Sequence, residues 1–317
     1  MKENVLVVLN SLTDTQVATL RKLCEENDYR FSLAANATEA EQYLSEATII
    51  YGGGSYLIKN APKLKWFHSA SAGVNNYIPV IKEETLLTNS AGAFGLSIAE
   101  HIIMVTLMML RKMPQYRQYT AERQWHKGLP QESIYGQRIT VVGTGDIGTR
   151  FAERVSAFHP SCINGVSRTG RKKPFFTATY PIDKLDELLP ETDLLVSCVP
   201  ETPETINYLN RKRIALLPQG ARIVNVGRGS AIDEDALIEA LESGKLAGAA
   251  LDVFRKEPLP EDSPLYKTAN LIITPHISGN LTIDYTKETN FNMFLTNLKH
   301  YINSEPMEHV VDRKLGY

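Results

Sequence analysis

Three residues whose side chains could carry acid–base chemistry each follow a different predicted strand: Arg228, Glu257 and His276. The strands that precede them are predicted at residues 222–226, 247–252 and 271–274. Because the carboxyl ends of parallel strands meet at one edge of a sheet, we expect these side chains to converge there. A histidine can exchange a proton near neutral pH, and a guanidinium can hold a carboxylate as a planar fork. Singly, each residue is more typical of a surface ion pair, so the prediction of a catalytic site depends on their convergence.

The segment Gly143–Gly148 has the spacing Gly-x-Gly-x-x-Gly, between a predicted strand at 139–142 and a predicted helix at 147–159. In this pattern the first glycine makes a tight turn, and the second lets the backbone approach a pyrophosphate. The third lets the helix pack closely on the strand. The helix N-terminus offers free N–H groups to the phosphate charge. The position of this turn between a strand and a helix predicts a dinucleotide-binding site.

The choice of dinucleotide depends on the segment after the next predicted strand, which ends near Ser167. An NAD-binding domain usually has an acidic residue there, about 20 residues past the glycines, for the ribose 2′-hydroxyl. Here Arg168 stands 20 positions after Gly148, Thr169 follows it, and three more cations occupy residues 171–173. A guanidinium holds a 2′-phosphate bidentately, whereas a carboxylate would repel it. The segment therefore predicts NADP(H) as the preferred cofactor, with NAD(H) possible; the alternative is a solvated basic loop.

A run of small residues, Ser71, Ala72 and Gly73, follows the predicted strand at 65–69. Their backbone amides could form a nest for a carboxylate. A plain turn is the commoner reading of such a run, so this prediction needs support from the rest of the chain.

The elements that must position these residues alternate between strands and helices, which predicts parallel sheets with helices on both faces. In the first hundred residues, strands are predicted at 4–9, 30–33, 47–51, 65–69 and 86–89, and helices at 14–27 and 38–45. One long, largely buried helix is predicted at 96–116, and a polar excursion with Trp125 at 117–137. Glu100 is expected to make a structural hydrogen bond, and His101 to be a core histidine.

The bulk composition limits the classes of protein that this chain can represent. A length of 317 residues favours two domains, and 43% hydrophobic with 22% charged residues is typical of a globular protein. A net charge of −2 gives no reason to expect nucleic acid or an acidic membrane as a partner. No apolar run approaches a membrane span, and the N-terminus enters a strand without a signal peptide. Three scattered cysteines, Cys24, Cys162 and Cys198, predict no metal site and a reduced, cytoplasmic setting.

Taken together, these motifs resemble those of the D-isomer-specific 2-hydroxyacid dehydrogenase family over essentially the whole chain. The matching motifs are Ser71–Val74, Thr88–Ser90, Ala99–Glu100, Gly143–Gly148, Asn225–Gly229, Leu251–Phe254 with Glu257–Leu259, and Thr274–His276. The resemblance implies an α/β fold of two doubly wound parallel-sheet domains. A Rossmann nucleotide-binding domain, residues 96–282, would be inserted into a flavodoxin-like substrate domain, residues 1–95 and 283–317. The hinge would lie on the long helix and near residues 278–283.

The resemblance also implies a role for each site residue. His276 would donate the proton to a 2-keto acid, Glu257 would orient its ring, and Arg228 would hold the substrate. Asp252 would hold the nicotinamide carboxamide. The substrate-binding residues would be Ser71, Ala72, Gly73, Arg228 and His276. The cofactor-binding residues would be Gly143, Gly145, Asp146, Ile147, Gly148, Ser167, Arg168, Thr169, Val199, Pro200, Val226, Gly227, Arg228, Asp252 and Gly279.

Among subgroups of the family, the chain is most similar to NADP-dependent glyoxylate/hydroxypyruvate reductases and general 2-ketoacid reductases, because the acidic residue of NAD enzymes is missing. The absence of a C-terminal extension disfavours a phosphoglycerate dehydrogenase with a regulatory domain. The family's frequent Gly-Val-Asp is here Gly73-Val74-Asn75, which leaves the carboxylate contacts of this loop open. The sequence does not indicate which small 2-keto or 2-hydroxy acid is the substrate.

Two alternatives remain at this point: a nucleotide-sensing regulatory protein of the same fold, and an NAD-preferring 2-hydroxyacid dehydrogenase. The first predicts NAD(H) preference and disordered tails, neither of which the sequence indicates. The resemblance also implies a homodimer, with residues 112–136 as a plausible contact. Trp125 would then either reach the neighbouring active site or pack within its own subunit.

Overall fold

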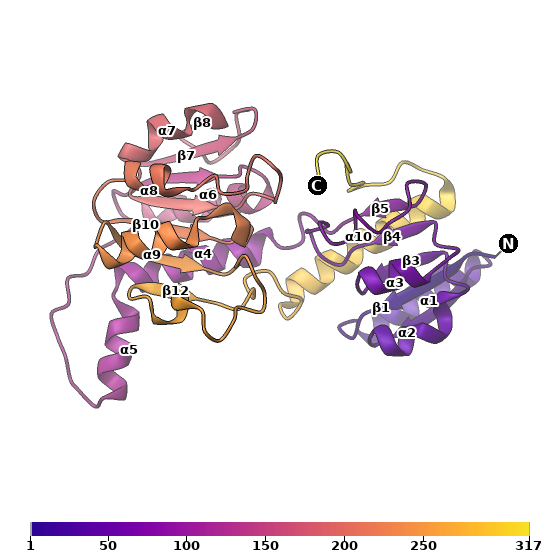
Figure 1. Cartoon of the computed structure of the whole chain (residues 1–317). Helices are drawn as coiled ribbons and strands as arrows, with labels where there is room; N and C mark the ends of the chain where they lie inside the picture. The colour runs from indigo at the N-terminus through magenta and orange to yellow at the C-terminus, as the bar shows by residue number, and fades with distance from the viewer. Residues whose placement is uncertain (1, 317) are drawn as a thin grey trace. The chain divides into compact units, whose positions relative to one another are not determined.

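A computed structural model describes residues 2–316 of the chain, which divides into two compact units (Figure 1). The first unit comprises Met1–Phe94 and Asn280–Tyr317, and the second comprises Gly95–Gly279. Each unit is built on its own sheet, and the strands of each sheet pair in parallel.

The sheet of the first unit has the strand order β2-β1-β3-β4-β5, the flavodoxin-like order. Its strands are β1 (Asn4–Val8), β2 (Arg30–Ala34), β3 (Ile49–Gly52), β4 (Trp66–His68) and β5 (Leu86–Thr88). Near the C-terminus, Val310 forms an antiparallel bridge to Thr88, which lies at the end of an edge strand.

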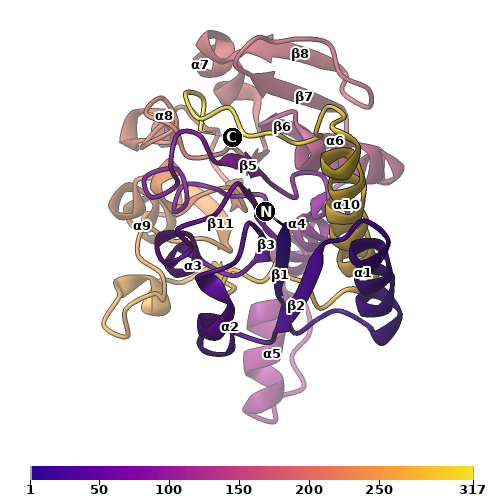
Figure 2. The ribbon, with the colours of Figure 1, turned by 90° about the vertical axis from the view of Figure 1, so that its right-hand side faces the viewer.

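Helices cover both faces of this sheet, as Figure 2 shows. The helices are α1 (Asp14–Glu26), α2 (Ala37–Leu44), α3 (Ser55–Asn60) and α10 (Asp284–Asn303). Side chains alternate along β1: Val5 and Val7 pack with α1 and α10, whereas Leu6 and Val8 pack with α2 and α3. This alternation follows from the two-residue period of a strand, and it places a hydrophobic core on each side of the sheet.

The sheet of the second unit has the order β12-β11-β10-β9-β6-β7-β8, in which β6 is the central first strand of a Rossmann arrangement. Its strands are β6 (Arg138–Val142), β7 (Cys162–Ser167), β8 (Ala178–Pro181), β9 (Leu194–Ser197), β10 (Ala221–Asn225), β11 (Leu246–Leu251) and β12 (Leu271–Ile273). The predicted fold class, α/β with two doubly wound parallel sheets, is confirmed. The edge strand β8 was not predicted, because its residues are only half-buried and include Pro181.

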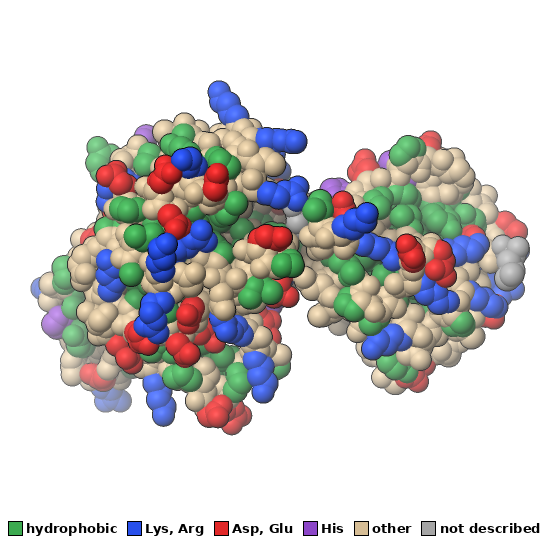
Figure 3. All heavy atoms as spheres, turned by 45° about the horizontal axis from the view of Figure 1, so that its top comes forward, with side chains coloured by type: hydrophobic (Ala, Val, Ile, Leu, Met, Phe, Trp, Pro, Cys, Tyr) green, Lys and Arg blue, Asp and Glu red, His purple; other side chains and the backbone are tan. Residues whose placement is uncertain are grey.

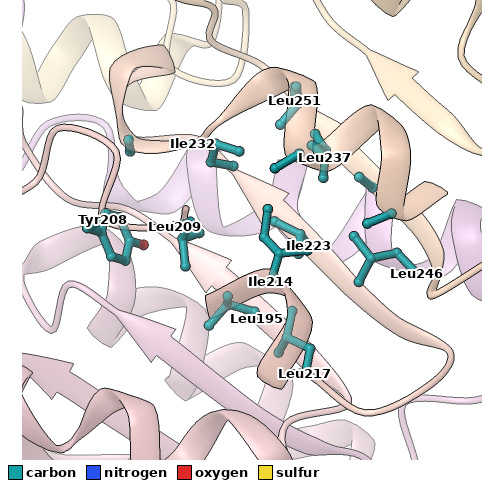
Figure 4. Close-up of a cluster of buried hydrophobic side chains, with 14 of the residues drawn as sticks. Leu195, Tyr208, Leu209, Ile214, Leu217, Ile223, Ile232, Leu237, Leu246 and Leu251 are labelled. Carbon is teal, nitrogen blue, oxygen red and sulfur yellow. The ribbon is translucent and has the colours of Figure 1, made fainter. Parts of the chain in front are cut away.

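The helices of the second unit also form two layers. They are α4 (Gly95–Leu110), α5 (Met113–Ala121), α6 (Asp146–Val155), α7 (Leu185–Leu188), α8 (Arg211–Leu216) and α9 (Glu234–Glu242). Helices α7, α8 and α9 pack over one hydrophobic cluster, and Figure 4 shows Ile214 and Leu237 against Leu195 and Ile223 of the sheet. Helix α4 packs against α6. Within residues 2–316, no helix is long and apolar enough to cross a membrane.

The prediction of one helix over residues 96–116 was wrong. Helix α4 ends at Leu110 and α5 begins at Met113, with Lys112 between them in the left-handed region at φ 57°. Pro114 explains the break, because its ring would clash with the carbonyl of Leu110 in a continuous helix, and it has no N–H to donate. Figure 1 shows α5 and the following loop extending away from the sheet of this unit. The side chains of α5 are not buried, and Trp125 in that loop is 91% exposed.

Candidate active site

The glycine-rich turn joins β6 to α6 in the second unit, and its three glycines differ in their surroundings. Gly143 has a φ of +106°, which glycine adopts readily, and a Cβ on Gly148 would overlap the Gly143 carbonyl. Around the position of a Cβ on Gly145, no atom of the described residues lies within 4 Å, apart from atoms of Gly145 and its two chain neighbours. The turn therefore has a close helix–strand contact at one end and open space at Gly145. This arrangement fits a pyrophosphate.

A cysteine that the sequence did not single out braces this turn. Cys198 follows β9, and its Sγ lies 3.1 Å from the carbonyl oxygen of Gly143. Burial raises the pKa of this thiol to about 12, so it stays protonated and donates to that carbonyl. Val199 and Pro200 come next in the same strand-end loop.

Asp146 and Ile147, also expected at the cofactor, are the first residues of α6. The Asp146 carboxylate lies against Gly95, the first residue of α4, so closely that a Cβ on Gly95 would overlap it. Burial raises the pKa of Asp146, and the nearby Arg150 opposes this shift. Because a carboxylate would repel a phosphate, its position against α4 suits a phosphate at the turn.

Ser167, Arg168 and Thr169 lie at the end of β7. Arg168 and Thr169 are exposed, and the Ser167 hydroxyl oxygen accepts a hydrogen bond from the Gly170 amide at 3.2 Å. The pKa of Glu204 is lowered, first by a hydrogen bond from Thr202 and in smaller part by the charge of Arg168. The sequence did not identify Glu204 as a neighbour of Arg168. On the face in Figure 3, Lys and Arg side chains project from the edge of the second unit, and acidic and basic groups are otherwise interspersed.

Arg228 follows β10, between Gly227 and Gly229, and neighbouring backbone fills the space beside both glycines. A Cβ on Gly227 would lie 2.6 Å from the Val199 carbonyl oxygen, and one on Gly229 would overlap the Phe254 backbone. The glycines therefore allow the loops after β9, β10 and β11 to approach one another, and Val226 and Gly227 form part of this junction.

The Arg228 guanidinium donates to the Gly227 carbonyl at 2.7 Å. Burial lowers the pKa of Arg228, and the charges of Glu201 and then Glu257 oppose the shift. Glu201 also accepts a hydrogen bond from Ser230. The sequence prediction missed Glu201, although it lies in the Pro-rich loop after β9. Two carboxylates therefore support the positive charge of a half-buried arginine.

His276 and Glu257 are brought together as predicted from their strand ends. The His276 Nδ1 lies 2.6 Å from Glu257 Oε2, and Glu257 Oε1 accepts the Phe254 amide at 2.9 Å. His276 has a φ of +53°, and its amide donates to the Asp252 carbonyl at 2.9 Å. Its side chain is 51% exposed, and Nε2 has no hydrogen-bond partner among residues 2–316. The carboxylate therefore fixes one ring nitrogen, and the other is available.

The expectation that Asp252 holds the nicotinamide carboxamide stays a prediction, and the structure shows which protein groups its carboxylate binds. It is 1% exposed, and its Oδ1 accepts from the Thr274 hydroxyl at 2.6 Å and the Ile277 amide at 2.9 Å. Its Oδ2 accepts from the Ser278 amide at 3.0 Å. The carboxylate thus clamps the loop that carries His276 and ends at Gly279, and its burial leaves it facing protein groups.

The neighbouring residues of α4 differ in part from expectation. His101 Nε2 lies 3.3 Å from the Thr274 hydroxyl, and burial lowers the pKa of His101 while Asp252 opposes the shift. His101 is thus a hydrogen-bonded, partly buried histidine. Glu100 is exposed, and its side chain makes no hydrogen bond within residues 2–316, because it lies on the outer side of the helix.

The loop of Ser71, Ala72 and Gly73 belongs to the first unit, after β4. The Ser71 amide donates to Ser69 Oγ at 3.1 Å, so it is already used. The amides of Ala72 and Gly73 donate to no group within residues 2–316. Two adjacent amides are therefore available to an anion. No group of three or more His, Cys, Asp or Glu among residues 2–316 could hold a metal ion.

Comparison with known proteins agrees with this geometry. Residues 103–278 match the family described as D-isomer specific 2-hydroxyacid dehydrogenase, NAD binding domain. The structure of a D-isomer specific 2-hydroxyacid dehydrogenase family protein from Aeromonas salmonicida is 33% identical, with a TM-score of 0.88, and covers 99% of this chain and 100% of its own. The NADPH-dependent glyoxylate/hydroxypyruvate reductase of Sinorhizobium meliloti, solved with NADP and sulfate, is 27% identical with a TM-score of 0.83, and the match covers 100% of both chains.

A further relative is longer than this chain. The D-3-phosphoglycerate dehydrogenase of Methanocaldococcus jannaschii is 33% identical over 81% of this chain. The chain spans only 49% of the length of that relative.

Proposed function

Because the chain belongs to the D-isomer-specific 2-hydroxyacid dehydrogenase family, we propose that it is an NADP-dependent reductase of small 2-keto acids, of the glyoxylate and hydroxypyruvate type. The observation that carries this proposal is the hydrogen bond of 2.6 Å between His276 and Glu257, beside Arg228, in the unit that holds the glycine-rich turn. The similarity to the Sinorhizobium meliloti reductase supports the substrate class. In this proposal Gly95–Gly279 is the nucleotide-binding domain and the first unit is the substrate domain.

His276 is the proposed proton donor. Reduction of a keto group puts negative charge on its oxygen, which then takes a proton. Glu257 accepts the Nδ1 hydrogen of the ring, which orients the imidazole. The available Nε2 then gives its proton to the oxygen. Glu257 can orient the His276 ring because its own position is fixed by a hydrogen bond from the Phe254 amide.

Arg228 is the proposed group for the substrate carboxylate and the developing oxyanion. Its guanidinium can hold two oxygens at once, and Glu201 and Glu257 help it to stay charged despite burial. In the first unit, the free amides of Ala72 and Gly73 are proposed to bind a substrate carboxylate. Both groups stabilise negative charge, which a keto acid carries throughout the reaction.

A bound nicotinamide would supply the hydride. The open space at Gly145 and the N-terminus of α6 fit the pyrophosphate of the dinucleotide. For the 2′-phosphate we propose Arg168, with Ser167 and Thr169 as hydrogen-bonding neighbours. The nearby Glu204 carboxylate would oppose a phosphate here, and the charge of Arg168 offsets it.

A homodimer is part of the same proposal. An apolar hollow of about 550 Å³ is lined by residues of α4 and α5 together with Arg111 and Gln131. Exposed Met104 and Met113 belong to it, and Trp125 is exposed in the loop that follows α5.

A cytoplasmic location stays a prediction. The three cysteines are free thiols in the structure.

A turnover assay tests the proposed reaction. Purified protein is mixed with NADPH or NADH and with glyoxylate, hydroxypyruvate, pyruvate or 4-hydroxyphenylpyruvate, and cofactor oxidation is followed by absorbance. We expect glyoxylate or hydroxypyruvate to be reduced, with a higher kcat/KM for NADPH than for NADH. Cofactor binding without oxidation on any of these acids would instead favour a nucleotide-sensing protein.

The cofactor preference has its own test in Arg168→Asp. A charge-assisted hydrogen bond contributes about 1.5–3 kcal/mol, so we expect this change to lower the affinity for NADPH by roughly one to two powers of ten. The effect should fall on the KM for NADPH, because the 2′-phosphate is remote from the hydride. Lys173→Asp makes the same change of charge on the same loop and should have a smaller effect. Equal use of NADH and NADPH by the unaltered protein would refute the assignment of Arg168.

A further inference from the structure

A buried histidine outside the proposed catalytic set lies at the end of β4 in the first unit. His68 is 0% exposed and is surrounded by the rings of Tyr51, Trp66 and Phe294, whose centroids lie 5.3–6.1 Å from its own. Its Nδ1 lies 2.7 Å from the Thr88 hydroxyl, and its Nε2 lies 3.3 Å from the Ser90 hydroxyl. Both ring nitrogens are therefore hydrogen-bonded inside an aromatic environment.

The direction of these hydrogen bonds follows from the groups at the two ends of the hydrogen-bonded series. The Ser69 carbonyl can only accept, so the Ser90 hydroxyl donates to it, at 2.9 Å. Ser90 must then accept from His68 Nε2–H, which leaves Nδ1 of the neutral ring as an acceptor. Thr88 donates to that nitrogen, and its oxygen accepts from the Trp66 indole N–H at 2.8 Å. The bonds thus run one way, from Trp66 through Thr88, His68 and Ser90 to the Ser69 carbonyl.

This series of hydrogen bonds ends at the loop in which the amides of Ala72 and Gly73 are free. Ser69 precedes Ser71, and its side chain accepts the Ser71 amide at 3.1 Å. The Ser90 amide donates in turn to the Ser71 carbonyl at 3.2 Å. His68 therefore holds Ser90, and Ser90 holds both ends of the turn that leads into Ala72 and Gly73.

Neutral histidine is the form that this arrangement requires. Burial lowers the pKa of His68 to about 3, so the ring carries no charge near neutral pH. A protonated ring would present N–H at Nδ1 and take away the acceptor that Thr88 uses. An apolar ring would fill the same space but would leave the buried hydroxyls of Thr88 and Ser90 without this partner, which is costly.

We propose that His68 is a positioning residue for substrate binding: through Ser90 it fixes the backbone of the 69–71 turn and so presents the Ala72 and Gly73 amides to the substrate carboxylate. The inference rests on the proposed function, because it takes the ligand of these amides to be the carboxylate of a 2-keto acid. His68 itself touches neither substrate nor cofactor.

The positioning step is tested by amide hydrogen exchange, which needs no turnover. In His68→Phe the ring shape is kept and both nitrogens are lost, so exchange over residues 69–75 should become about 10- to 100-fold faster. In His68→Gln a donor of similar reach toward Ser90 remains, and exchange should move back toward that of the unaltered protein. Thr48→Val removes another buried hydroxyl, which is bonded to Asn4 at the far end of the sheet, and is the matched control. If His68→Phe does not fold, Ser90→Ala removes the same link with a smaller change.

The consequence for binding is tested with glyoxylate and NADPH. Misplacing a binding group by about 1 Å can cost about 100-fold, so we expect His68→Phe to raise the KM for glyoxylate about 10- to 100-fold. The kcat should change much less, and the dissociation constant of NADPH should not change, because NADPH is assigned to the second unit. Thr48→Val should leave all three constants unchanged.

Two results overturn the inference: unaltered loop exchange in His68→Phe, or equal changes in exchange and KM for His68→Phe and Thr48→Val. If the proposed reductase function is wrong, the experiments give a different result. In that case the unaltered protein reduces none of the keto acids, while the exchange experiment still decides whether His68 holds the loop.

Discussion

His276 and Glu257 face each other at the ends of neighbouring strands, and substitution of His276 tests the proposed proton transfer. We expect His276→Ala to lower kcat by about 10²–10⁴-fold, the usual contribution of a proton donor, while NADPH still binds. Steady-state kinetics and NADPH fluorescence give the two quantities. Glu261→Gln alters an exposed acid on the same loop and should leave kcat unchanged. Nearly full activity in His276→Ala would mean that another group donates the proton.

A second residue-scale prediction concerns acid stability and His68. Its pKa falls from the ordinary 6.5 to about 3 in the folded chain, so the unfolded chain takes up a proton first as the pH drops. The stabilisation is complete above about pH 6.5 and is lost as the pH falls toward 3, by an amount of order 3–5 kcal/mol. Urea unfolding at pH 7.5 and 4.5 measures about 2–3 kcal/mol of this loss, because pH 4.5 lies between the two pKa values.

The variant His68→Gln isolates this contribution. The difference in unfolding free energy between the two pH values should be smaller in His68→Gln than in the unaltered protein. His159→Gln, which alters an exposed histidine, should keep the original difference. An unchanged difference in His68→Gln would show that another group governs the acid sensitivity.

At the scale of secondary-structure elements, the N-termini of α4 and α6 meet through Gly95 and Asp146. A Cβ on Gly95 would overlap the Asp146 carboxylate, so Gly95→Ala should destabilise the second unit by about 1–3 kcal/mol. In the double variant with Asp146→Ala the overlapping carboxylate is gone, and the two losses should not add. A cycle of four unfolding measurements gives the coupling. Strict additivity would mean that the two helix ends do not constrain each other.

Loops at neighbouring strand ends also act on one another. The glycines beside Arg228 let the loops after β9 and β11 come close, and the buried carboxylate of Asp252 holds the loop after β12. The positions of Glu257 and His276 therefore depend on close backbone approach at the glycines and on the hydrogen bonds of the Asp252 carboxylate.

At the scale of the whole molecule, we expect two copies of the 35.4 kDa chain to associate through α4 and α5. Met104 is 45% exposed and Met113 is 47% exposed beside an apolar hollow, and burying such side chains is favourable. Sedimentation velocity at micromolar concentration should show a dimer. Met104→Glu should shift it toward monomer, whereas Leu33→Glu, at an apolar site on the first unit that is 38% exposed, should not. A monomeric unaltered protein would remove this proposal.

The sequence by itself determined the fold class and the meeting of His276 with Glu257. Strand and helix periodicity is local, and the Gly143–Gly148 spacing marks one particular strand–turn–helix unit. Once the strands are parallel, residues that follow neighbouring strands must lie at the same edge. Pro114 also indicates the break between α4 and α5, but the apolar pattern on both sides of it favoured one continuous helix.

The tertiary structure alone decided where the remaining side chains lie. Asp252 lies against the loop that carries His276, Asp146 lies against Gly95, and Glu201 and Glu204 come beside arginines from other strand ends. Loop conformation at a strand end depends on which backbone segments approach it, and those segments are distant in sequence. Spacing along the chain predicts which loops become neighbours, but the direction of a side chain within a loop follows only from the packing of all of them together.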